Sequence, residues 1–208
     1  MKHIKLVIAI LALTTTAFAA KSKKTDKSTA TAETYKLDTS ASTIEWKGIK
    51  KVGSFHVGGI KVQSGEIIVE NNLIKSGQVV VDMKTITNTD LTDKTFNAKL
   101  VGHLSNEDFF NVEKNPTSTF KLTSATAGKN KDEMIIKGEL TMIGATQPIE
   151  FPATVKFDKG TATGQGTLKI DRTKWGLKYG SGNFFKELAG DKIINDEFEL
   201  TLKLVAKK

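Results

Sequence analysis

The segment from Ile149 to Asp158 alternates apolar and polar residues over ten positions. One face of this segment holds Ile149, Phe151, Ala153, Val155 and Phe157. The other face holds Glu150, Thr154, Lys156 and Asp158. Because side chains of a β-strand point alternately to opposite sides, this pattern predicts a strand with one buried and one solvated face.

The same alternation recurs along the chain. The last segment places Phe198, Leu200, Leu202 and Leu204 on one face. Shorter versions are Ile44/Trp46, Phe55/Val57, Val79/Val81, Phe120/Leu122, Leu140/Met142 and Leu168/Ile170. Glycine and asparagine turns separate these segments, and about eight strands are expected. Eight antiparallel strands with one apolar face can close into a barrel that holds one small ligand. A two-layer sandwich, whose core side chains leave no such room, is the alternative.

One interval breaks this rhythm. Phe96, Leu100 and Leu104 recur every four residues, as on one face of a helix, and Thr92 or Asp93 is suited to cap its start. We expect one short helical excursion, about residues 92 to 111, with this face packed on the barrel.

Two further segments carry aromatic residues in irregular surroundings. Ser105 to Asp108 resembles a cap that starts a turn presenting Phe109 and Phe110, and Pro116 stops any continuation. The glycines and aromatics between Trp175 and Phe185 predict a loop over an apolar opening.

The ends of the chain differ from this middle part. Residues 1–19 read as a signal peptide, because Lys2 and Lys5 precede a short apolar run and Ala17-Phe18-Ala19 is a cleavage pattern. Residues 20–34 contain no large apolar side chain and cannot contribute to a core, which predicts a flexible tether before the first strand. Residues 35–207 then form one domain, exported to the periplasm or secreted.

Charge and composition exclude several functions. The chain of 208 residues has a formal charge of +8, but Arg172 is its single arginine, and base and phosphate recognition in nucleic acids relies heavily on arginine. We therefore expect no nucleic-acid partner, although dispersed lysines allow transient contact with an anionic membrane surface. The absence of Cys excludes thiolate catalysis, disulfides and Cys-based zinc sites.

The motifs of common catalytic sites are missing too. His56 and His103 lie 47 positions apart, without the spacing of a metal site. Gly180-Ser181-Gly182 lacks the pattern of a nucleophile elbow, and Gly164-Gln165-Gly166 lacks the rest of a phosphate-binding loop. These gaps favour binding over catalysis, with no catalytic residue, no metal and no cofactor. Ordinary core packing and a lined apolar tunnel both fit the regular apolar positions.

Two motifs resemble the signature of the YceI-like family. The first is Asn97 to Asn111 with Asn115 to Phe120, which contains H-L-x-x-x-D-F-F, and the second is Ile136 to Ile149, which contains L-T-x-x-G-x-T-x-P-I. The resemblance covers about residues 35–207. In the first third, Trp46 to Lys50 and Gly53 to Gly58 resemble the version typical of Bacteroidetes members.

This resemblance implies an extended eight-stranded antiparallel barrel, lipocalin-like in shape, that encloses a long isoprenoid lipid such as a quinone or prenyl phosphate in the periplasm. Together with the alternation, it predicts a tunnel lined by Trp46, Phe55, Val57, Leu100, Phe109, Phe110, Phe120, Leu140, Met142, Phe151, Val155, Phe157 and Leu200. The polar head of the lipid is expected near His56, His103 or Asn97. An enzyme acting on a lipid-like substrate and a stress-associated structural binding module remain as alternatives, and homodimers are left open.

Overall fold

A computed structural model describes residues 31–208, which form one antiparallel sheet of nine strands. The strands are β1 (Glu33–Leu37), β2 (Thr43–Lys50), β3 (Phe55–Glu70), β4 (Leu73–Asp82), β5 (Thr117–Ala127), β6 (Glu133–Met142), β7 (Ala145–Asp158), β8 (Thr161–Asp171) and β9 (Ile194–Lys207). One helix, α1 (Lys94–Ser105), lies between β4 and β5. Three 3₁₀ turns complete the structure: η1 (Met83–Thr85), η2 (Arg172–Trp175) and η3 (Gly190–Lys192).

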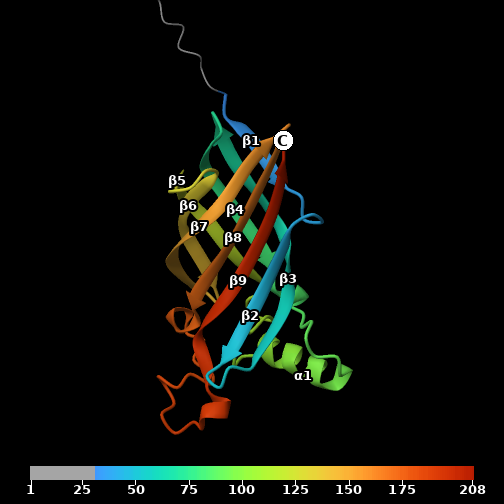
Figure 1. Ribbon diagram of the computed structural model, residues 1–208. Coiled ribbons are helices and arrows are strands. Elements are labelled where there is room, and N and C mark those ends of the chain that lie inside the picture. The colour runs from blue at the N-terminus through green and yellow to red at the C-terminus, as the bar shows by residue number, and fades with distance from the viewer. Residues whose placement is uncertain (1–30) are drawn as a thin grey trace, which may run out of the picture.

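The sheet closes on itself as an eight-stranded barrel (Figure 1). Consecutive strands from β2 to β9 pair as neighbours, and β9 pairs back onto β2. The short β1 pairs with β3 and β9 beyond the end of β2, so β1 and β2 together occupy one position of the barrel. The predicted eight-stranded antiparallel barrel is therefore confirmed, and the sandwich alternative is wrong.

Three tight turns fix the register of the hairpins. Asn71-Asn72, Ile143-Gly144 and Lys159-Gly160 each join two strands with only two residues, and all six residues have positive φ. Two-residue turns of this kind match the right-handed twist of the strands they connect. Four of the six are glycine or asparagine, the residues that tolerate this backbone best, whereas Ile143 and Lys159 also adopt it as the first residue of their turns.

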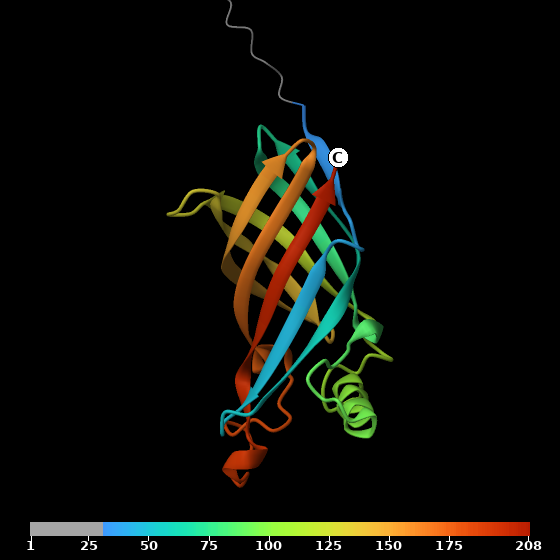
Figure 2. The same cartoon turned by 45° about the vertical axis from the view of Figure 1, so that its right-hand side comes forward.

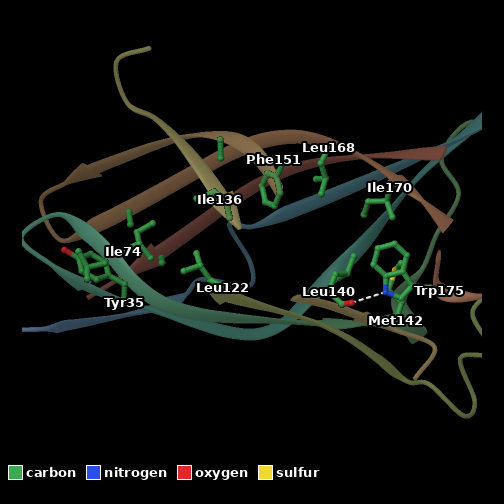
Figure 3. Packing of buried hydrophobic residues seen from close by; sticks show 14 residues of the cluster. Tyr35, Ile74, Leu122, Ile136, Leu140, Met142, Phe151, Leu168, Ile170 and Trp175 are labelled. Atoms are coloured by element: carbon green, nitrogen blue, oxygen red, sulfur yellow. Dashed lines mark hydrogen bonds between the residues drawn. The ribbon is translucent and has the colours of Figure 1, made fainter. Parts of the chain in front are cut away.

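The alternation in β7 gives the orientation that the sequence predicts. Ile149, Phe151, Ala153, Val155 and Phe157 all belong to or pack against the apolar cluster inside the barrel. The intervening residues from Glu150 to Asp158 are exposed. Figure 3 shows that the buried side chains are spread along the inside of the barrel rather than gathered in one compact core.

The barrel wall parts between β7 and β8. These strands pair only from Thr154 to Asp158, opposite residues 161–165, whereas the first half of β7 pairs with β6 alone. Pro148 and Pro152 lie in this half. Since proline has no backbone N–H to donate, it is suited to a strand edge without a partner.

The two ends of the barrel differ (Figures 1 and 2). At one end, β1 and the C-terminus of β9 lie together, and the buried Tyr35 packs edge-on against Phe157 with ring centroids 6.0 Å apart. The opposite end carries helix α1, the β2–β3 hairpin turn and the long loop between β8 and β9. We call these the closed end and the open end.

Helix α1 lies within the predicted range of 92 to 111 and begins as expected. The Asp93 side chain accepts hydrogen bonds from the backbone N–H groups of Thr95 and Phe96 and so caps the helix. The expected packing of its apolar face is only partly right, because Phe96 is 60% exposed. The partly buried apolar residues of the helix, Leu100, Val101 and Leu104, all lie in its second half.

The predicted signal peptide and most of the predicted tether lie outside the described residues. The last two tether positions, Glu33 and Thr34, belong instead to β1 and pair with Val69 and Ile68. These two polar residues can belong to a strand because the next residue, Tyr35, supplies the side chain that is buried in the barrel. Within residues 31–208, no helix is long and apolar enough to span a membrane.

Candidate functional site

The barrel encloses one long cavity of about 860 Å³. All strands from β2 to β9 contribute side chains to its wall. At the closed end the wall includes Leu37, Ile74 and Ala206, and at the open end it includes Tyr179 and Leu188. The volume lies toward the upper end of the range of small-molecule sites, roughly 300 to 1,000 Å³. The regular apolar positions of the sequence thus line a space rather than fill one.

Ten of the thirteen predicted tunnel residues lie on this wall. They are Trp46, Leu100, Phe109, Phe110, Phe120, Leu140, Met142, Phe151, Val155 and Leu200. Their contact with a ligand stays a prediction. They come from both the strands and the α1 region, so the structure brings together segments that are far apart in the chain.

Phe55 and Val57 do not lie on the wall, so their predicted place in the tunnel is wrong. The two residues do share a face of β3, but the wall receives the even-numbered neighbours His56 and Ile60. Phe55 is 49% exposed. A β-bulge between Val62 and Ser64 shifts the register, and after it the odd-numbered Ile67 faces the cavity. The bulge reverses which residues point inward.

Phe157 is the third predicted tunnel residue that does not lie on the cavity wall. It faces inward, but it packs against Tyr35 at the closed end, beyond the cavity. Phe157 therefore helps to close the barrel instead of lining the tunnel.

Trp46 and Gly58 fix the segment that leads to α1. The indole Nε1 of Trp46 donates a hydrogen bond of 3.0 Å to the carbonyl oxygen of Thr87. A Cβ atom at Gly58 would lie 1.8 Å from that same oxygen and 2.6 Å from the Trp46 ring. Only glycine permits this approach. The backbone N–H groups of Thr87 and Thr89 donate to the carbonyl oxygens of Gly59 and Val57, which holds this segment alongside β3.

Asn97 is not at the cavity, so its predicted role as a head-group residue is wrong. Its side-chain amide donates to the carbonyl oxygens of Asn88 and Leu91 and to the Asn88 side chain. These contacts tie α1 to the preceding loop. Asn97 thus positions the helix whose residues Leu100 and Leu104 reach the cavity wall.

His56 and His103 both lie on the wall at the open end, and each is paired with a carboxylate. His56 Nδ1 is 2.8 Å from Asp90 Oδ2, and His103 Nε2 is 3.0 Å from Asp108 Oδ2. Burial opposes ionisation of Asp90, but hydrogen bonds from the Val57 amide and from the His56 side chain outweigh it and hold the pKa of Asp90 below its ordinary value.

An aromatic cluster surrounds His103. Its ring lies edge-on to Phe109 and Tyr179, with centroid distances of 4.9 and 4.6 Å. Phe109 comes from the turn after α1 and Tyr179 from the loop before β9, and their rings are 5.2 Å apart. The cluster therefore joins the two irregular segments that the sequence singles out, directly at the cavity mouth.

The sequence analysis missed Arg172 as a residue of this site. The guanidinium is buried, reaches the cavity wall and donates to the carbonyl oxygens of Leu177, Ile194 and Asn195. Burial lowers its pKa, against the opposing effect of Asp196, whose Oδ1 lies 3.7 Å from Nη2. Its occurrence as the single arginine of the chain is the one signal in the sequence that could have indicated this role.

The charges on the wall are of one sign. Its ionisable residues are Lys50, His56, His103, Arg172, Tyr179 and Lys192. No aspartate or glutamate lies on the wall that the described residues form, although the chain has 23 acidic residues. All of these groups except Arg172 come from the hairpin, helix or loop of the open end. The arrangement suits a ligand with an apolar tail and an anionic or hydrogen-bond-accepting head.

Groups suited to nucleophilic catalysis are scarce on this wall. Ser118 is its only serine or threonine among the described residues, and its hydroxyl donates to Met83 Sδ at 3.1 Å. Among residues 31–208, no three His, Cys, Asp or Glu side chains gather as a metal site would require. The site as described can bind and enclose an apolar molecule.

Comparisons with known proteins agree with this architecture. The family model of the YceI-like domain matches residues 35–206. A UPF0312 protein of Pseudomonas aeruginosa (strain LESB58) is 42% identical over 71 residues, and the match spans 34% of this chain and 36% of that protein. A UPF0312 protein of Pseudomonas putida (strain F1) is 32% identical over 133 residues, which is 60% of this chain and 63% of that protein.

Two solved structures share the fold at low sequence identity. Burkholderia cenocepacia BcnA superposes with a TM-score of 0.64 at 23% identity, covering 82% of this chain and 99% of that one. A polyisoprenoid binding domain from Saccharophagus degradans gives a TM-score of 0.61 at 16% identity, covering 83% of this chain and 97% of that one. At these identities the likeness establishes the barrel fold.

Proposed function

Because the chain belongs to the YceI-like family, we propose that it binds one long-chain isoprenoid lipid in the barrel cavity and stores or carries that lipid without transforming it. The observation that carries this proposal is the apolar cavity of about 860 Å³ that runs along the barrel and opens at one end. The polyisoprenoid binding domain of Saccharophagus degradans, which has the same fold, supports the choice of ligand.

The energetics of such binding need no reacting group. When a chain of several isoprene units enters the barrel, hundreds of square ångströms of its apolar surface are removed from water. Each square ångström contributes roughly 25 cal/mol to binding. The barrel is already formed around its cavity, so little protein ordering opposes this gain.

Between the two head groups expected from the sequence, the wall favours a prenyl phosphate over a quinone. Lys50 and Lys192 supply positive charge, and the described wall carries no carboxylate to repel an anion. Hydrogen bonds from charged donors to a phosphate are about twice as strong as neutral ones. A quinone oxygen would use the same donors but would leave their charge uncompensated.

Organic extraction of the purified protein followed by mass spectrometry tests the carrier proposal. We expect one isoprenoid species in a stoichiometric amount, unchanged in mass after incubation with the protein. A well-folded protein that neither retains nor takes up such a lipid would disprove the proposal, and turnover of the bound lipid would establish the enzyme alternative.

The head-group preference needs its own test. Farnesyl phosphate and a quinone with the same tail are compared on the wild type and on a Lys50→Ala/Lys192→Ala variant. We expect the variant to weaken phosphate binding by roughly tenfold or more, corresponding to about 1.4 kcal/mol, with little change for the quinone. Equal losses for both ligands would contradict a phosphate head.

We also propose that the protein works in the cell envelope after removal of residues 1–19. The motive is the order of Lys2 and Lys5, the apolar run and Ala17-Phe18-Ala19. Intact mass of the envelope protein should correspond to a chain beginning at Ala20. A dominant form that retains Met1 would contradict export by this route.

A further inference from the structure

The open end of the barrel gathers exposed apolar side chains. Seven large hydrophobic residues are exposed in the described part of the chain, and six of them lie at this end. They are Val52, Phe55, Phe96, Tyr179, Phe184 and Phe185, with exposed fractions between 41% and 60%. The seventh, Leu73, is the first residue of β4, at the closed end. Such clustering on one face marks an interaction surface, whereas scattered exposed residues do not.

Most of this surface belongs to two segments that touch each other. The backbone N–H of Lys51 donates to the carbonyl oxygen of Ile193 at 2.9 Å, and Lys50 pairs with Ile194 in the sheet. The β2–β3 hairpin and the loop before β9 therefore form one projection, seen at the bottom of Figure 1. We define residues 47–55 and 178–192 as the tip.

Three of the exposed phenylalanines have a lysine ammonium over the ring. Lys47 Nζ lies 4.5 Å from the centroid of Phe55, and Lys178 Nζ lies 4.7 Å from that of Phe184. On α1, beside the tip, Lys99 takes the same position over Phe96 at 5.6 Å. An aromatic ring with an adjacent lysine can enter the apolar region of a bilayer while its cation stays among the head groups.

The charge of the tip is strongly positive. It contains six lysines and two acidic residues, Glu187 and Asp191, an excess of four positive charges. Helix α1 adds two lysines and no acidic residue. The nearby carboxylates of Asp90 and Asp108 are engaged by His56 and His103. The tip therefore complements a partner with a negatively charged surface and an apolar layer below that surface.

We infer that the tip docks the open end of the barrel onto a lipid bilayer with anionic head groups. Phe55, Phe184 and Val52 enter the head-group boundary, and the tip lysines contact the lipid phosphates. Tyr179, Phe185 and Lys192 belong both to this surface and to the cavity wall, so docking places the mouth directly on the bilayer. The inference rests on the proposed function for its purpose: an isoprenoid could then enter the barrel without crossing water.

Co-sedimentation of the mature protein with vesicles tests the docking. Vesicles of phosphatidylcholine alone are compared with an equal mixture of phosphatidylcholine and phosphatidylglycerol. We expect binding to the mixed vesicles, weakened by salt because the Debye length falls from about 10 Å at 0.1 M to about 3 Å at 1 M. Val52→Ser/Phe184→Ser and Lys51→Glu/Lys186→Glu should each reduce binding at least about tenfold. Leu73→Ser and Lys156→Glu are the matched controls and should bind as the wild type does.

Three results would overturn the inference: no binding of the wild type to the mixed vesicles, equal binding by the tip variants and their controls, or self-association of the protein that the apolar tip variant abolishes. Mass spectrometry of the same preparations separates this inference from the carrier proposal. Retained isoprenoid without vesicle binding would overturn docking alone, and vesicle binding by a protein that never holds an isoprenoid would overturn the carrier proposal alone.

Discussion

The indole Nε1 of Trp175 donates a hydrogen bond of 2.9 Å to the carbonyl oxygen of Leu140 (Figure 3). Trp175 ends η2, directly after β8, and Leu140 lies on β6, two strands away. The side chain of Gln147 supports this contact by donating to the carbonyl oxygen of Lys174 at 3.1 Å. The link joins the segment after β8 to the β6–β7 hairpin, where β7 and β8 no longer pair.

We expect Trp175→Phe to destabilise the barrel although it keeps an aromatic ring. Trp175 is only 4% exposed, so the substitution removes a buried hydrogen bond and leaves space behind. Loss of such a partner costs about 1 to 3 kcal/mol, which urea unfolding can measure. Lys174→Ala, an exposed neighbour, is the control. Equal midpoints for the two variants would show that the link contributes nothing.

The alternation of β7 and β9 could be predicted because each strand is regular over its inward-facing segment. β3 could not be oriented in the same way, since its bulge between Val62 and Ser64 depends on pairing with a distant strand and leaves no clear mark in the sequence. The pair Phe55/Val57 looks like any other inward pair. Only the register of the hairpin with β2 shows that its neighbour His56 faces the cavity.

Phe110→Ala and Phe96→Ala should differ sharply in their effect on stability. Phe110 is partly buried and packs against the apolar cluster, whereas Phe96 is exposed. Removing a fully buried phenylalanine side chain costs roughly 3 to 5 kcal/mol, so we expect a loss of about 2 to 3 kcal/mol for Phe110→Ala and less than about 0.5 for Phe96→Ala. Thermal or urea unfolding of both variants provides the measurement. An unchanged midpoint for Phe110→Ala would contradict its packing.

The helical period of Phe96, Leu100 and Leu104 predicted α1, but it did not predict which turns of the helix touch the barrel. That depends on how Asn97 and Trp46 attach the preceding loop. Arg172 was missed for a related reason. Its partners are backbone carbonyl oxygens, of Leu177 in the adjacent loop and of Ile194 and Asn195 at the start of β9, and backbone oxygens carry no sequence signal.

Asp90→Asn should make stability less dependent on acid pH. The folded protein lowers the pKa of Asp90, so its ionised form stabilises the fold above the unfolded value of about 3.9, and this contribution is lost as the pH falls through the lower folded value. Unfolding free energies at about pH 6 and about pH 3 should therefore differ more in the wild type than in the variant. Other carboxylates such as Asp38 titrate in both proteins and cancel in the comparison. Parallel pH profiles would refute the role of Asp90.

A charge placed inside the cavity should separate a binding tunnel from a merely incomplete core. Val155 lies on the wall opposite Gly164 of β8, toward the closed end, whereas the adjacent Lys156 is exposed on the outside. In Val155→Lys the ammonium would have no acidic partner on the wall, and burying such a group costs at least about 2 kcal/mol. We expect the variant to lose bound lipid on organic extraction and to unfold at lower urea, with Leu140→Glu behaving alike. Lys156→Ala should keep both the lipid and the midpoint. If Val155→Lys folds stably and still carries a full complement of isoprenoid, the lipid does not occupy this part of the barrel.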